Sequence, residues 1–379
     1  MTRVGIRRWT CVACAGVCAG WITHNAAGDT RGSDGPSEAP ARYSAAADAS
    51  LVIRSVENAA LLYNRYWLMW DEAQIGELQV DFAISDPAWR PNEQASAWLR
   101  ESTEIAGLLR ATRLERADFG VERELGFEIM LPHLRSLRST ARLFIADTRR
   151  LEHEGDHDAA AERIAATFRL AHHLSEVEST LLIETLVGVA IFALASAEVE
   201  RMSEANALTP EARDLLMAEL DRFPASDPLN LQAAFIRENA FCLAECHRLF
   251  GQAAEDAQSL QILAEMSEHA QQPYAMLARM NAQERQDDLA KLARYYEAAE
   301  AVLARPDADR GAAMEDLVEA GAFGQLARIL SASVDQIARG IERSSEVAAS
   351  AHEALRRVAD QPAEGDAATG RTRPALPPR

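Results

Sequence analysis

The stretch that decides the fold spans residues 144–168 and reads FIADTRRLEHEGDHDAAAERIAATF. Large apolar side chains recur at helical spacing on both sides of Gly155-Asp156, which predicts one helix before this pair and another after it. Because glycine and aspartate are turn residues, we expect the pair to break the helix and let the second rod fold back on the first. This arrangement predicts one hairpin of the tetratricopeptide type. No second copy follows about 34 residues further on, so we expect a local packing unit rather than a repeat array.

The composition extends this prediction to an all-α fold. Of the 379 residues, 48% are hydrophobic and only 6% aromatic, so leucine and alanine have to fill a sizeable core. Together with glutamate and arginine they favour helices, and β-branched residues rarely alternate as they would in strands. We therefore expect a multi-helix bundle. The predicted helices span residues 50–72, 92–115, 132–153, 157–174, 177–203, 210–222, 228–250, 255–270, 274–304, 309–320 and 324–360.

Proline marks the first turn of three of these helices. Pro132, Pro210 and Pro228 stand at the predicted starts, where a missing amide hydrogen does no harm. Thr209 and Asp227 directly precede two of these prolines, and we expect both to cap the helix that follows. The boundaries follow from this punctuation to within about two to four residues.

Two late helices carry an apolar seam at heptad spacing, which favours helix-on-helix packing. The seam positions are Leu289, Leu292, Tyr296, Ala299 and Leu303 in the first helix, and Val334, Ile337, Ile341, Ala348, Ala351, Leu355 and Val358 in the second. We expect the two helices to form a long C-terminal helical hairpin within the chain. A dimerising coiled coil is the alternative.

The N-terminus is typical of an export signal, with three arginines before a weakly apolar stretch that is short for a membrane span. Arg7-Arg8 leaves open a twin-arginine signal, and Cys14 or Cys18 leaves open lipidation. We therefore expect a protein of the periplasm, the cell envelope or the medium. The expected divisions are a signal peptide (1–27), a flexible linker (28–47), an N-terminal helical domain (48–206), a C-terminal helical region (207–360) and a disordered proline-rich tail (361–379).

The run from Leu181 to Ala197 is apolar almost all round and contains Glu184. A transmembrane span and a buried central helix both fit such a run. The acidic residue and the many amphipathic helices nearby favour the buried helix. We expect no stable membrane span in the mature chain.

The segment His153-Glu154-Gly155-Asp156-His157 matches the H-E-x-x-H pattern of zinc hydrolases. There, one continuous helix directs both histidines at the metal, the glutamate acts as general base, and a third ligand follows at about the distance of Glu176. His153 and His157 face the same way only if the helix continues through Gly155-Asp156, where we expect a turn. We therefore expect a polar turn with no metal ligand and no catalytic residue. A zinc-dependent hydrolase is the alternative.

The segment Cys242-Leu243-Ala244-Glu245-Cys246-His247 is close to a haem attachment motif but has one residue too many. On a helix Cys242 and Cys246 share a face and His247 does not, so we expect two buried thiols and no cofactor. His172-His173 ends a predicted helix, where imidazolium would favour the helix C-terminus. We expect His133 to pack or to form hydrogen bonds rather than to act as a base.

Short motifs in order along residues 55–202 resemble those of a group of secreted helical proteins abundant in planctomycete bacteria. They are Asn58-Ala59-Ala60 with Tyr63, Asp118-Phe119-Gly120, Leu131-Pro132-His133-Leu134, Leu137-Arg138 with Ala141-Arg142-Leu143, Gly155-Asp156 with Ala159, Arg169-Leu170-Ala171-His172-His173, and Leu186-Val187-Gly188 with Ala190-Ile191. Members often carry Cys-Asp-Trp-Gly where this chain has Ala117-Asp118-Phe119-Gly120. The resemblance implies an exported protein with helical hairpins, and it implies no catalytic residue.

The net charge of −19 argues against nucleic-acid binding, because phosphate backbones repel an acidic surface that lacks basic stripes. Most arginine and glutamate side chains are read as solvated helix faces. We therefore expect a non-catalytic exported protein that binds a protein partner or itself, or that assembles in the cell envelope.

Overall fold

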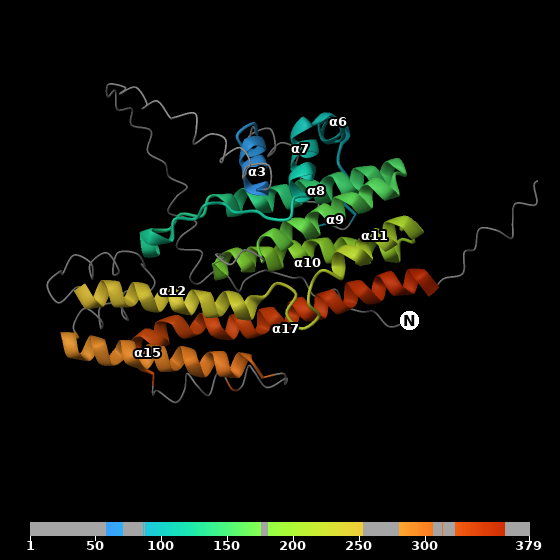
Figure 1. The fold of residues 1–379 in the computed structure, drawn as a ribbon. Helices are drawn as coiled ribbons and strands as arrows, with labels where there is room; N and C mark the ends of the chain where they lie inside the picture. The colour runs from blue at the N-terminus through green and yellow to red at the C-terminus, as the bar shows by residue number, and fades with distance from the viewer. Residues whose placement is uncertain are drawn as a thin grey trace, which may run out of the picture. The chain divides into compact units, whose positions relative to one another are not determined.

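The computed structural model describes residues 58–70, 86, 88–175, 181–252, 280–305, 313 and 323–360. Of these residues, 77% are helical and none lies in a strand, which confirms the all-α prediction (Figure 1). The helices are α3 (Ala59–Trp67), α6 (Glu93–Glu101), α7 (Thr103–Thr112), the 3₁₀ helix η1 (Arg123–Glu128), α8 (His133–Glu154), α9 (His157–His173), α10 (Leu182–Glu204), α11 (Pro210–Leu220), α12 (Leu231–Gln252), α15 (Ala282–Leu303) and α17 (Gly324–Asp360).

Several predictions fall outside the described residues. These are the signal peptide (1–27), the linker (28–47), the tail (361–379), the helix at 255–270 and almost all of the helix at 309–320. The same holds for the first residues of the helices predicted at 50–72, 177–203 and 274–304.

The chain divides into two compact units. Of the described residues, those from 235 to 339 form one unit, and those from 58 to 234 together with 340–360 form the other. In the larger unit α11 packs on α9, and the last part of α17 joins the core through Ala351 and Leu355. The domain boundary after residue 206 stays a prediction.

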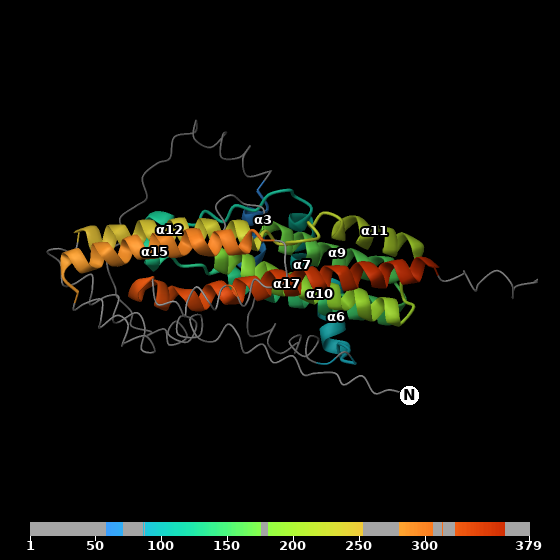
Figure 2. The same cartoon turned by 90° about the horizontal axis from the view of Figure 1, so that it is seen from below.

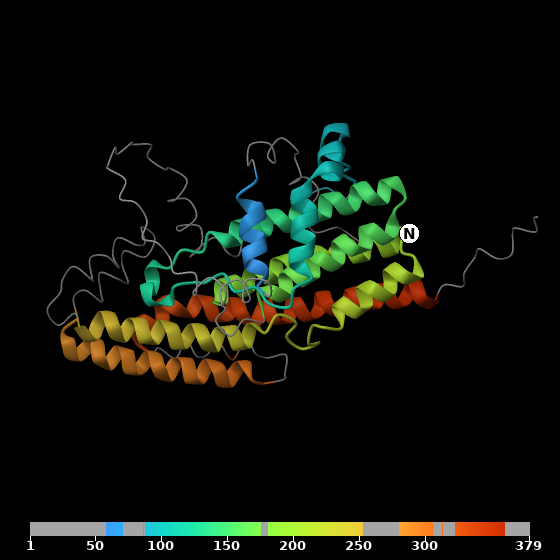
Figure 3. The same cartoon turned by 45° about the horizontal axis from the view of Figure 1, so that its top comes forward.

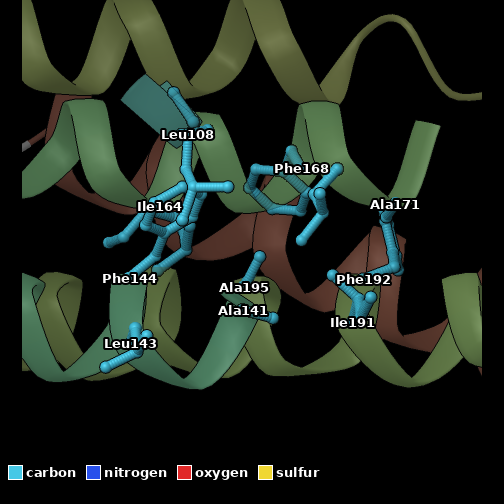
Figure 4. Close-up of a cluster of buried hydrophobic side chains, with 14 of the residues drawn as sticks. Leu108, Ala141, Leu143, Phe144, Ile164, Phe168, Ala171, Ile191, Phe192 and Ala195 are labelled. Atoms are coloured by element: carbon cyan, nitrogen blue, oxygen red, sulfur yellow. The ribbon is translucent and has the colours of Figure 1, made fainter. Parts of the chain in front are cut away.

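Helix α9 lies at the centre of the larger unit, where it packs against α8, α10 and α11. Figure 3 shows α3 and α7 running side by side across the long helix α8. The core is built largely from phenylalanine, leucine and alanine, and Figure 4 shows Phe144, Ile164 and Leu108 grouped between the helices. Phe168 and Phe192 have ring centroids 5.4 Å apart. Burying each such side chain contributes about 1.5–3 kcal/mol.

The turn between α8 and α9 lies where the glycine and aspartate predict it. Gly155 ends α8 with φ of 82°, a left-handed conformation that glycine adopts without strain. The Asp156 carboxylate then accepts a hydrogen bond from the Ala159 amide at 3.1 Å and caps α9. The two long helices are therefore separate rods that pack on each other.

Two local predictions are wrong. The helix predicted at 92–115 is interrupted at Ser102, whose extended backbone ends α6 and whose hydroxyl caps α7 by accepting from the Ile105 amide. Asp227 does not cap a helix that begins at Pro228. Its carboxylate reaches forward to the amides of Leu231 and Gln232, both at 2.9 Å, and α12 begins at Leu231.

In the smaller unit α12 and α15 lie side by side (Figure 2). Phe235 of α12 meets Tyr296 of α15 edge to face, and the Asn239 amide donates to the Glu300 carboxylate at 3.2 Å. The start of α17 is held by α15, since the Asp288 carboxylate accepts from the Leu326 amide at 2.9 Å. The predicted seam of α15 is buried within the chain. A long two-helix C-terminal hairpin stays a prediction.

Helix α10 is long and apolar enough to cross a membrane by length and composition alone, the one such helix among the described residues. In this structure 56% of its apolar window is buried inside the chain, and it packs against α8 and α9. Among the described residues it contributes to the core of the larger unit. The absence of a membrane span stays a prediction.

Candidate functional site

A histidine–carboxylate pair joins the starts of α8 and α10. His133 is the first residue of α8, and its Nε2 lies 2.9 Å from Oε1 of Glu184 in the first turn of α10. Both side chains are buried, with 7% and 6% of their surface exposed. The second carboxylate oxygen accepts from the Leu181 amide at 2.7 Å. Because a buried carboxylate is costly without partners, these two donors explain how an acidic residue fits the apolar helix.

A second buried histidine joins α9 to α3. The Tyr63 hydroxyl lies 3.0 Å from Nδ1 of His173, and Nε2 of His173 lies 2.6 Å from the carbonyl oxygen of Leu114. Burial lowers the pKa of His173 to about 4, so the ring is neutral at pH 7. A neutral ring that donates to a carbonyl from Nε2 has to accept at Nδ1, so the Tyr63 hydroxyl is the donor.

Stacked aromatic rings connect the two histidine contacts. Phe119 lies on the His133 ring with centroids 4.4 Å apart and planes 9° from parallel. Its other neighbours are Tyr63 at 6.2 Å and Trp67 at 6.0 Å. Such offset stacks contribute about 0.5–1.5 kcal/mol beyond burial. We call Tyr63, Trp67, Phe119, His133, His173 and Glu184 the histidine cluster.

Hydrogen bonds hold the backbone of the segment before Phe119 against the start of α3. The side-chain Nδ2 of Asn58 donates to the backbone carbonyl of Asp118 at 2.8 Å, and its side-chain Oδ1 accepts from the backbone amide of Asp118 at 2.9 Å. The Ala59 amide donates to the carbonyl of Arg116 at 2.8 Å. Residues far apart in sequence therefore position Phe119 over His133.

Comparisons of the chain with family models, with curated proteins and with solved structures found no match. The resemblance to the planctomycete proteins stays a prediction. Five of the residues in these motifs, Asn58, Tyr63, Phe119, His133 and His173, lie in or beside the histidine cluster.

The chemistry open to the histidine cluster is limited by these contacts. With a pKa of about 4, His173 would be a weak general base at neutral pH. The Glu184 oxygens already accept from His133 and Leu181. Among the described residues no three His, Cys, Asp or Glu side chains gather in a way that could hold a metal ion. The cluster is a connection between α3, α8, α9 and α10.

The proposed zinc ligands lie on two different helices. His153 belongs to the exposed last turn of α8, whereas His157 is the first residue of α9. Glu154 forms ion pairs with Arg100 and Arg150, both at 2.6 Å. The hydrogen bond from Arg100 is the main reason that the Glu154 pKa lies below its ordinary value. Glu176 lies outside the described residues.

Reading the arginine and glutamate side chains as solvated faces is wrong for α8 and α10. Asp147 is fully buried and pairs with Arg150 at 2.8 Å and Arg163 at 2.7 Å. Arg149 and Glu198 form a second buried pair at 2.5 Å. The one sequence signal was the position of Asp147, three residues after Phe144 and four before Leu151 on the apolar face.

The two cysteines of α12 are free, buried and on one face. Burial raises the pKa of Cys246 to about 12, and it raises that of Cys242, beside Glu238, well above the usual value. Both thiols are therefore protonated at pH 7. His247 is exposed, away from them. The geometry is that of packed thiols, as the helical spacing indicated.

Proposed function

We propose that this protein is a non-catalytic exported helical protein that binds another protein or assembles in the cell envelope. The observation that carries the proposal is the histidine cluster. Its titratable groups are the residue types that enzymes use, yet each already has a partner within the fold. His133 pairs with Glu184, and His173 bonds to the Tyr63 hydroxyl and the Leu114 carbonyl. Such pairings favour a rigid scaffold, because buried polar networks specify one arrangement of helices.

Export is part of the same proposal and is supported by the sequence pattern of residues 1–27. Mass spectrometry of the N-terminus of protein recovered from the periplasm or medium tests it. Recovery of the uncleaved chain from the cytoplasm alone would contradict it.

We further propose that α8 and α9 form a tetratricopeptide-type hairpin. The close approach of the two helices is supported by Ala160, which is fully buried, and by Phe144, Ile164 and Phe168, which fill the seam. A single hairpin of this kind stabilises its own unit rather than propagating an array. We also propose that the helices with heptad seams at residues 289–303 and 334–358 form a C-terminal hairpin, because apolar seams at this spacing favour helix-on-helix packing.

The test of the main proposal is chemical crosslinking in intact cells, followed by recovery of the full chain. A reproducible crosslinked species of defined mass is expected. A chain that stays uncrosslinked and monomeric would overturn the proposal. Metal analysis of the purified chain tests the zinc-hydrolase alternative, since stoichiometric zinc that is lost in His153→Ala would favour it over the main proposal.

A further inference from the structure

Helix α3 carries a face with exposed apolar side chains that none of the described residues covers. Of the six exposed large hydrophobic residues described, Leu61 lies in α3, Leu68 is its C-cap and Met69 follows in the next turn. Their surfaces are 47%, 88% and 54% exposed. Asn64 and Arg65 are the other exposed positions. At 100° per residue the exposed positions of the helix and its C-cap, 61, 64, 65 and 68, share one arc of about 100°.

The spacing of these residues is that of a helix that binds another helix. Relative to Leu61, the exposed positions follow at i+3, i+4, i+7 and i+8. Polar Asn64 and Arg65 stand at i+3 and i+4, between apolar Leu61 and Leu68 at i and i+7. A helix that lies lengthwise against a partner helix or groove contacts it at these positions. Single exposed apolar residues are ordinary on protein surfaces, whereas exposed apolar residues that gather on one face are a feature of interaction sites.

The opposite face of α3 holds the helix in place. The Tyr66 hydroxyl accepts from Arg110 at 2.6 Å, Trp67 Nε1 donates to Thr140 at 3.0 Å, and Tyr63 bonds to His173. A helix fixed in this way does not have to be ordered when a partner binds. Such preorganisation strengthens binding because less conformational entropy is lost.

The charge of this face indicates the chemistry of the partner. Arg65 is the one charged residue among positions 58–70, in a chain of net charge −19. Its guanidinium lies 5.8 Å from the centroid of the Tyr66 ring, and among the described residues it forms no ion pair. A carboxylate on the partner, set between apolar side chains, would complement it.

We propose that the outer face of α3, comprising Leu61, Arg65, Leu68 and Met69, docks an amphipathic helix of another protein that presents a carboxylate to Arg65. This inference rests on the proposed function, since it names the partner class and the surface for protein binding. A second copy of the chain and a lipid surface are outcomes that the test separates from it.

The test uses two fluorescent helical peptides of equal length. Both carry leucine at i, i+3, i+4 and i+7, and they differ in having glutamate or lysine beside the leucines. Fluorescence anisotropy with the full chain should show tighter binding of the glutamate peptide. Arg65→Glu should reverse this preference, and Leu68→Gln should weaken binding about tenfold or more, as for an interface hot spot. Leu125→Gln is the matched control, because Leu125 is as exposed as Leu61 but lies outside α3.

Equal binding of the two peptides, no binding of either, or equal losses in Leu68→Gln and Leu125→Gln would overturn the inference. Binding to anionic or zwitterionic vesicles that Leu68→Gln abolishes would assign the face to lipid instead. A dimer in sedimentation that Leu68→Gln dissociates would assign it to a second copy. If the in-cell crosslink persists in Leu68→Gln, the proposed function stands and the inference about α3 falls.

Discussion

The Tyr63 hydroxyl lies 3.0 Å from Nδ1 of His173, a residue 110 positions further along the chain. The other ring nitrogen lies 2.6 Å from the Leu114 carbonyl. One neutral imidazole therefore links α3, α9 and the segment after α7. The Tyr63 hydroxyl, the His173 ring and the Leu114 carbonyl are buried or partly buried. Loss of one of them would therefore leave a neighbouring polar group without its hydrogen bond.

Replacing Tyr63 by phenylalanine should destabilise the chain by about 1–3 kcal/mol, because it leaves Nδ1 of His173 buried without a donor. Chemical denaturation followed by circular dichroism measures the loss. Tyr295→Phe is the control, since the Tyr295 hydroxyl is buried and has no hydrogen-bond partner among the described residues. Removing that hydroxyl should leave stability unchanged or raise it. Equal losses in the two variants would contradict the role assigned to Tyr63.

Acid should weaken the fold through His172 and His173, whose pKa values are lowered to about 4, mainly by burial. Between pH 6.5 and 4 the unfolded state binds protons that the folded state does not. The contribution of the two histidines to the free energy of unfolding is therefore fully present above pH 6.5 and is lost as the pH falls towards 4. For His173 the full loss is roughly 3 kcal/mol. The free energy of unfolding across this window should depend less steeply on pH in His173→Gln. An unchanged slope would show that the ring titrates normally.

Gly107 is required where α7 meets α3. A Cβ atom at this position would lie 2.0 Å from the Tyr66 ring. Gly107→Ala should therefore destabilise the chain by about 1–3 kcal/mol, even though alanine favours helices. Gly340→Ala is the control, because its Cβ would lie 3.3 Å from a Leu231 methyl group. In a Tyr66→Leu background the effect of Gly107→Ala should shrink. If Gly107→Ala caused the same loss of stability in the Tyr66→Leu background, the clash would not be with the Tyr66 ring.

Helix ends and caps can be predicted from the sequence where neighbouring residues alone cause them. The break at Gly155-Asp156 follows from two adjacent residues, and so does the cap from Thr209 to the Ala212 amide in front of α11. The interruption at Ser102 is not predictable from local sequence, because serine is tolerated inside helices. It becomes a boundary where α6 packs on α8 and α7 packs on α3.

The sequence indicates some residues of the histidine cluster, but it does not indicate which of them contact each other. Glu184 stood out as an acid within an apolar run, and His133 as a residue that forms hydrogen bonds. Nothing in the sequence connects them across 51 positions, because tertiary packing alone brings the two helix starts together. The same limit applies to Asp147, whose burial depends on arginines from α8 and α9.

Asp147 provides the sharpest test of the buried ion pairs. Asp147→Ala would leave Arg150 and Arg163 without the carboxylate that both contact, so the chain should lose about 3–5 kcal/mol of stability, the range for breaking a buried pair. Asp214→Ala is the control, because that carboxylate is 71% exposed beside Arg213, and exposed pairs contribute about 1 kcal/mol or less. Denaturant midpoints at low and high salt separate the cases, since the buried network should respond weakly to salt. If Asp147→Ala were as mild as Asp214→Ala, the buried network would add nothing to the stability of α8 and α9.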